Sequence, residues 1–246
     1  HSYYGGVPNS ALSLEAVDEL LLIPDYFKIF IFLAYENTNV NRRILATLFS
    51  AHKLLGLNFG SAYNINEAFE VLSGIPAHRV NLRHFSVIEG ATMLTGFPTN
   101  ILKSVTSLRL NDLSIDDKAL KALCTGIAES TSLTNMNLSG WEWNDGIEAD
   151  LFFPALEANR SIHTLTMERC ALKDTVIDRF VPLIGGKGRP LKKLYLSCNA
   201  FRHKGSSLIH ANGLTDLVML SKTLSVDACL NMLEALPLND TLKTAM

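Results

Sequence analysis

Residues 162–172 (IHTLTMERCAL) and 191–201 (LKKLYLSCNAF) carry the pattern that decides the fold. Both match the template Leu-x-x-Leu-x-Leu-x-x-(Asn/Cys)-x-Leu, in which the fourth and sixth positions of a short strand point to the same side. One such unit cannot bury its apolar face alone, whereas stacked units can. The pattern therefore predicts a parallel sheet built from successive units.

Looser copies of the template extend through most of the chain. The predicted units begin at residues 27, 54, 77, 105, 133, 162, 191, 214 and 242, so successive starts are 27, 23, 28, 28, 29, 29, 23 and 28 residues apart. The first copy is read as Phe27, Phe30 and Phe32, and the third begins at Ala77 and continues through Leu82. The 23-residue spacings predict either shortened segments between strands or a degenerate unit whose start is misplaced.

The segments between the strands have the spacing of amphipathic helices, as at Leu120, Leu123 and Ile127. Helix caps are predicted at Asp116, at Asp174, and at Ser225 or Asp227. A strand plus a helix in each unit predicts an α/β solenoid, with a curved parallel sheet on its concave side and helices on its convex side. We expect one domain over residues 1–246. Within it, residues 1–26 form a helical lead-in or the end of a preceding unit, and residues 41–55 form a helix.

The repeat length resembles that of the ribonuclease-inhibitor class of leucine-rich-repeat proteins. Residues 152–162 (FFPALEANRSI), 180–184 (FVPLI) and 189–196 (RPLKKLYL) also resemble the repeats of CARMIL-type regulators of actin capping protein. That resemblance implies a scaffold and a dimerisation platform, although the disordered segment with which that family binds capping protein has no counterpart here. The ninth template position departs from the consensus, because only Cys170 and Asn199 are of the expected type.

Composition excludes several classes of function. The 246 residues carry a formal net charge of −2, so no basic excess indicates nucleic-acid binding. The most apolar stretch, residues 20–34, is interrupted by Pro24, Asp25 and Lys28 and is too short for a membrane span. The four cysteines are widely separated and form no CxxC pair, which favours a reducing, cytoplasmic compartment. The chain begins at His1 and stops inside a unit, so we expect a fragment of a longer protein.

The chain carries no recognisable catalytic motif. Residues 185–188 (GGKG) lack the P-loop pattern and stand between a helix and a strand, the reverse of the required order. The histidines have no cluster of carboxylates beside them, so neither a metal site nor a cofactor is predicted. Trp141 and Trp143 fall on inward positions and are expected in the core; the alternative is that Trp141 is a partly exposed anchor.

The predicted function is therefore non-catalytic binding of a protein partner of unknown identity through the concave face. Side chains between the inward positions should face a partner there, where arginine and tyrosine are frequent anchors. The candidate partner-binding residues are Arg83, Arg109, Asn137, Glu168, Arg169 and Tyr195. Two alternatives stay open: regulation of an enzyme, such as activation of a small GTPase, and the sensor repeats of an immune receptor or pathogen effector.

Overall fold

The structure is a computed structural model that describes residues 29–33, 54–59, 65–80, 82–88, 93–141, 143, 147–184, 188 and 190–245. The predicted lead-in at residues 1–26 lies outside the described residues, as does the predicted helix up to residue 53. Residues 54 and 55, which that helix was expected to include, begin a strand instead.

The described strands form one open, all-parallel sheet in chain order, β1 to β9. The strands are β1 (Ile29–Leu33), β2 (Leu54–Phe59), β3 (His84–Ile88), β4 (Ser107–Asn111), β5 (Asn135–Asn137), β6 (Thr164–Thr166), β7 (Lys193–Tyr195), β8 (Asp216–Val218) and β9 (Thr244–Ala245). This arrangement confirms the α/β class and the parallel pairing of successive units.

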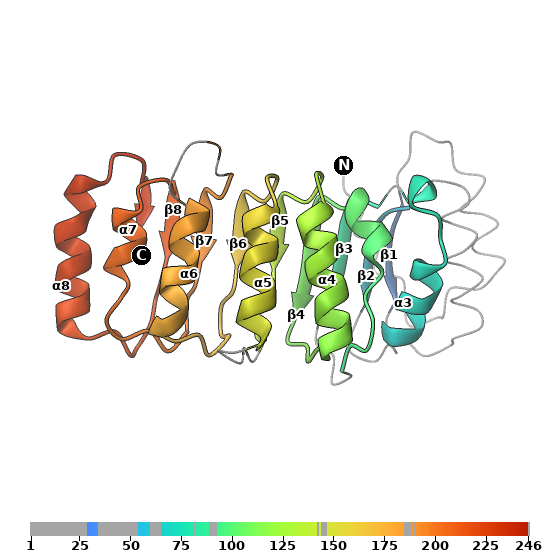
Figure 1. The fold of residues 1–246 in the computed structure, drawn as a ribbon, viewed down its shortest axis with the longest axis horizontal. Coiled ribbons are helices and arrows are strands. Elements are labelled where there is room, and N and C mark those ends of the chain that lie inside the picture. The colour runs from blue at the N-terminus through green and yellow to red at the C-terminus, as the bar shows by residue number, and fades with distance from the viewer. Residues whose placement is uncertain are drawn as a thin grey trace.

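Helical segments alternate with these strands. They are α3 (Ile65–Ser73), η1 (Ala77–Arg79), η2 (Thr99–Lys103), α4 (Asp117–Glu129), α5 (Ile147–Ala158), α6 (Asp174–Ile184), α7 (Ser206–His210), α8 (Val226–Ala235) and η3 (Leu236–Leu238). Figure 1 shows α4, α5 and α6 as a row of helices that covers one side of the sheet. None of the described helices has the length and apolar character that a membrane span requires.

The core lies between the sheet and this row of helices. The fourth positions of the paired strands β2 to β8 are all buried there: Leu57, Phe85, Leu108, Met136, Leu165, Leu194 and Leu217. The helices add their own apolar stripes, such as Leu120, Leu123 and Ile127 of α4. The inward side chains of the strands and the apolar sides of the helices therefore form one buried layer, as the template predicts.

The strand register corrects the start of the third unit. Phe85 pairs with Leu108, so the unit begins at Leu82 and not at Ala77, which lies in η1. The starts then run 54, 82 and 105, and the short 23-residue spacing falls between 82 and 105. The five-residue η2 fills that interval, and the five-residue α7 fills the other short unit. The prediction of shortened segments is confirmed, although one of them was misplaced.

The first unit is shifted by one residue from its prediction. Ile31, and not Phe30, pairs with the inward position Leu57, while Phe30 pairs with Gly56. A register irregularity between Ile29 and Phe30 accompanies this shift. Lateral pairing, which the sequence does not display, decides between such neighbouring apolar residues.

Two of the predicted helix caps are confirmed and one is wrong. The side chain of Asp116 accepts a hydrogen bond from Ala119 N, and that of Ser225 accepts one from Ala228 N. Asp174 is instead the first residue of α6, and its carboxylate accepts bonds from the next unit. Its donors are the backbone N–H groups of Arg202 (3.0 Å), His203 (3.1 and 3.2 Å) and Lys204 (3.4 Å).

A side-chain donor at the ninth position ties some of the turns to the unit before them. In three consecutive units this donor reaches the carbonyl of the preceding sixth position: Trp141 Nε1 to Leu110 O (2.6 Å), Cys170 Sγ to Leu138 O (3.3 Å), and Asn199 Nδ2 to Met167 O (2.7 Å). The expectation that only Cys170 and Asn199 meet this requirement is therefore wrong, because the indole of Trp141 supplies the same donor.

Asn199 makes the fullest set of these contacts. Its Oδ1 accepts the N–H groups of Cys170 (2.9 Å) and Leu172 (3.1 Å), and its Nδ2 also donates to Leu196 O (2.8 Å). Because the side chain is buried, water cannot replace these bonds. We expect Asn199→Ala to lower the free energy of unfolding by about 2 to 4 kcal/mol, measured by urea denaturation.

The matched control is Asn135→Ala, at an exposed strand position, which we expect to change stability by less than about 0.5 kcal/mol. Equal effects of the two substitutions would contradict the assigned role of Asn199.

Asp174 predicts a pH dependence of stability. Desolvation raises the pKa of its carboxyl, but the N–H donors of Arg202, His203 and Lys204 outweigh it, so the net pKa lies below the ordinary value. A lowered folded-state pKa stabilises the fold above the unfolded pKa of about 3.9, and that contribution is lost as the pH falls through the folded value. In denaturation series from neutral to acidic pH, we expect Asp174→Asn to be less stable than the wild type at neutral pH.

This stability difference should shrink as the pH falls below about 4. The control is Asp240→Asn, an exposed carboxylate, for which the difference should stay small throughout. A stability difference for Asp174→Asn that does not change with pH would contradict the role of the charged carboxylate.

Candidate functional site

The side of the sheet away from the helices is the candidate surface, and we call it the open face. It is formed by the third, fifth and seventh positions of each unit, which alternate with the buried fourth and sixth positions. The fifth positions from β3 to β8 are Ser86, Arg109, Asn137, Thr166, Tyr195 and Val218, paired side by side in the register. Figure 1 shows α4, α5 and α6 on the other side of this sheet.

Four of the predicted binding residues lie on the open face. Arg109 is exposed in β4, and Asn137 and Tyr195 are half-buried in β5 and β7. Glu168 occupies a seventh position just beyond β6 and is also half-buried. Arg109, Asn137 and Tyr195 share one row, so a ligand that crosses the strands could touch all three.

Arg83 does not belong to this group. Once the third unit begins at Leu82, Arg83 occupies its second position, before β3, and is exposed at the edge where the strands start. The fifth position of that unit is the buried Ser86. The wrong start at Ala77 placed Arg83 five positions too far along its unit, so its predicted place in the middle of the face is corrected.

Polar neighbours hold Arg109 and Asn137 in place. The Asn111 amide fits its surroundings when its oxygen accepts from Arg109 Nε (3.0 Å) and Nη2 (3.1 Å) and its nitrogen donates to Asn137 Oδ1 (3.0 Å). Asn137 Oδ1 also accepts from Ser139 N (3.0 Å). These bonds order the guanidinium before any partner arrives, which lowers the entropy cost of binding.

Sequence reasoning missed the seventh position as the support of this face. Asn111, Ser139 and Ser197 are buried polar residues there. Ser139 Oγ accepts from Glu168 N (3.2 Å), and Ser197 Oγ accepts from Leu220 N (3.3 Å). The small polar side chains at three of the seventh positions were visible in the sequence and could have indicated this role.

Arg169 lies at the rim where the strands end. The eighth positions of four consecutive units all have a left-handed backbone: φ is 53° at Asp112, 79° at Gly140, 55° at Arg169 and 60° at Cys198. A Cβ on Gly140 would lie 1.9 Å from Asp112 Oδ1, so glycine leaves room for that carboxylate. Arg169 Nη2 lies 3.5 Å from Asp112 Oδ2, and both side chains stay largely exposed, so the pair is worth at most about 1 kcal/mol.

The two tryptophans are core residues, as predicted. Trp141 and Trp143 are 3% and 8% exposed, and their rings stack at a centroid distance of 5.8 Å. Trp143 also contacts Phe152 of α5 at 4.7 Å. The alternative of Trp141 as an exposed anchor is wrong, because its indole is enclosed between units.

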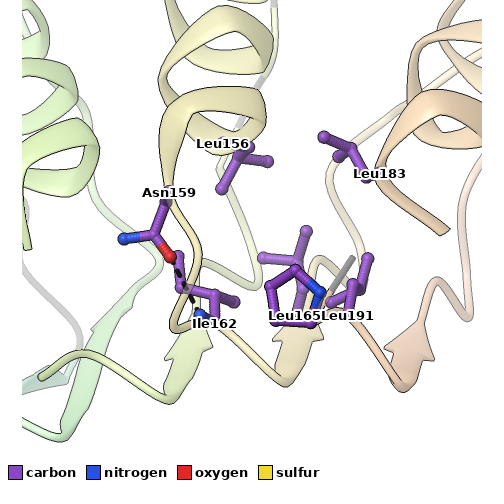
Figure 2. A pocket seen from close by; sticks show the side chains of 7 residues that line it. Leu156, Asn159, Ile162, Leu165, Leu183 and Leu191 are labelled. Carbon is purple, nitrogen blue, oxygen red and sulfur yellow. Dashed lines mark hydrogen bonds between the residues drawn. The ribbon is translucent and has the colours of Figure 1, made fainter. Parts of the chain in front are cut away.

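A small internal cavity lies between α5 and α6 and the strands beneath them (Figure 2). Its volume is about 20 Å³, and its lining is mainly aliphatic, with Leu156, Leu165 and Leu183 from three elements. The one polar lining side chain, Asn159, already donates to Ile127 O and Ser130 O and accepts from Ser161 N and Ile162 N. The cavity is far smaller than the pockets that hold metabolites.

The cysteines separate into two kinds. Burial raises the pKa of Cys124 and that of Cys170 to about 11, so neither thiol is ionised at neutral pH. Cys198 and Cys229 are exposed. Within the part of the chain that the structure describes, no three histidine, cysteine or acidic side chains are placed to hold a metal ion.

Neither of two comparisons with known proteins found a match. No protein-family model matches the chain, and no curated protein matches it. The similarity to ribonuclease-inhibitor-class and CARMIL-type repeats therefore stays a prediction from the sequence.

The burial pattern predicts the reactivity of the thiols. In the native protein we expect a water-soluble thiol reagent to modify Cys198 and Cys229 quickly and to leave Cys124 and Cys170 unmodified. All four should react in denaturant, with mass spectrometry of peptides as the measurement. Fast native labelling of Cys170 would contradict its place in the core.

Proposed function

We propose that this chain is a leucine-rich-repeat solenoid that binds a protein partner through the open face and catalyses no reaction. The observation that carries the proposal is the row of Arg109, Asn137, Thr166 and Tyr195, which crosses four adjacent strands on the side away from the helices. We further propose a cytoplasmic location, for which the separated free cysteines are the support.

The size and chemistry of the row support a protein ligand. Neighbouring strands lie about 4.8 Å apart, so Arg109 and Tyr195, three strands apart, are separated by roughly 14 Å. That distance fits inside a standard interface patch of about 800 Å² per partner. Arginine and tyrosine are enriched among the residues that dominate binding energy, and Arg109 is already ordered by Asn111.

The test compares two surfaces of the same protein. The open-face variant combines Arg109→Ala, Glu168→Ala and Tyr195→Ala, and the helix-face control combines Lys118→Ala, Lys121→Ala and Arg179→Ala. All six side chains are exposed or half-buried, so both variants should keep the circular dichroism of the wild type. Partners captured from the source cells would be identified by mass spectrometry and then measured as purified proteins.

We expect the open-face variant to weaken binding of the purified partner by about tenfold or more, and the control to change it by less than about twofold. If the open-face variant binds as the wild type does while the control variant loses binding, the proposal is wrong and the helices form the binding surface.

A further inference from the structure

We propose that the edge of the sheet where the strands start binds an acidic, extended polypeptide segment of the partner. This inference rests on the proposed function and specifies the chemistry of the partner. It is carried by one row of residues, which we call the edge row, formed by the second positions of seven consecutive units: Arg83, Thr106, Thr134, His163, Lys192, Thr215 and Lys243.

The edge row is continuous in space. Each backbone N–H along it donates to the carbonyl of the preceding member at 2.7 to 2.9 Å, from Thr106 N to Arg83 O through to Lys243 N to Thr215 O. The row contains basic and threonine residues and no acidic one. Arg83, His163, Lys192 and Lys243 are exposed.

The threonines are already occupied within the fold. Thr106 Oγ1 donates to Arg83 O (3.0 Å) and Thr134 Oγ1 donates to Thr106 O (3.0 Å). Thr215 Oγ1 lies closer to Asp216 Oδ2 (2.8 Å) than to Lys192 O (3.2 Å). The cationic side chains are therefore the members of the row that remain for a ligand.

Some exposed cations elsewhere on the molecule pair with carboxylates, whereas the cations of the edge row have no such partner among the described residues. Away from this edge, Arg169 pairs with Asp112, Arg179 with Asp150, and Lys204 with Asp178. Among the residues that the structure describes, no carboxylate lies within 4 Å of the charged atoms of Arg83, Lys192 or Lys243. Lys192 Nζ donates only to Gly213 O, at 3.3 Å.

Compensation of helix dipoles does not explain these charges. The helix carboxyl ends point toward this edge, and cations in a last turn would stabilise them. However, the last turns of α3, α4, α5, α6 and α8 contain no basic residue. The cations stand at the strand starts instead, beside the open face.

The net charge of −2 does not reveal how unevenly the charged residues are distributed between the two edges of the sheet. Next to the edge row, the third positions add Lys193, which lies 3.4 Å from its single acidic neighbour, Asp216. At the opposite rim, the seventh and eighth positions of the described units carry Asp112 and Glu168 with one cation, Arg169. The described residues therefore place several cations where the strands start, and two carboxylates with one cation where they end.

An extended acidic polypeptide fits this layout. At about 4.8 Å per strand, the edge row is roughly 29 Å long, the length of about nine extended residues. The row holds no tryptophan, tyrosine or phenylalanine on which nucleic-acid bases could stack.

The experiment uses a fluorescein-labelled decaglutamate peptide and fluorescence anisotropy. It compares the wild type with Lys192→Glu/Lys243→Glu, which reverses two exposed cations two strands apart on the row. The matched control is Lys118→Glu/Lys121→Glu, which makes the same change of net charge on the exposed side of α4. Thermal unfolding of each variant verifies that it is folded.

We expect the edge-row variant to weaken decaglutamate binding about tenfold or more and the control to change it by less than about twofold. Binding to the wild type should also weaken steeply between about 50 and 300 mM salt, because the contacts are exposed charges.

Four results would overturn the inference: no binding of decaglutamate, equal loss in the two variants, tighter binding of a DNA duplex or of phosphatidylserine vesicles, or self-association of the wild type that the edge-row variant abolishes. Equal loss would mean that binding depends on net charge alone. Tighter binding of DNA or vesicles would indicate another class of polyanion, and self-association would indicate a second copy of the chain. If decaglutamate fails to bind while the open-face variant still loses the partner, only the inference about the edge row fails.

Discussion

In the middle of this fold, three consecutive units are each held to the preceding unit by a hydrogen bond at the turn after the strand. At that point the chain leaves the sheet, and the carbonyl of the sixth position would otherwise be buried without a partner. Trp141, Cys170 and Asn199 each supply a donor to that carbonyl in the preceding unit. Because an unsatisfied buried carbonyl is costly, this contact stabilises the strand register of these units, in which the fourth and sixth positions face the helices.

The open face follows from that register. Once the fourth and sixth positions are fixed toward the helices, the third, fifth and seventh positions must point to the other side. The polar seventh positions then satisfy backbone N–H groups of the next unit, as Ser139 does for Glu168. The surface is therefore largely polar, and Arg109 and Tyr195 lie on it. The described thiols with raised pKa values, Cys124 and Cys170, are enclosed beneath it.

Parallel stacking also determines how residues of different units are arranged on the surface. Because every strand runs in the same direction, equivalent positions of different units gather along a single edge. A lysine at one second position is a single charge, whereas Arg83, His163, Lys192 and Lys243 together form one side of the molecule. The same geometry gathers four left-handed residues, from Asp112 to Cys198, along the opposite rim.

The sequence by itself determined the α/β class, the parallel order of the units from residue 105 to 191, and the places of Arg109, Asn137 and Tyr195. It could do so because one apolar spacing fits each of those segments. It could not place the third unit, because Ala77, Val80 and Leu82 satisfy the template as well as Leu82, Phe85 and Val87 do. Only pairing with β4 chose the second set, and that choice moved Arg83 from the face to the edge. The role of Trp141 was likewise decided by the tertiary structure, since its indole N–H matters only where the carbonyl of Leu110 lies beside it.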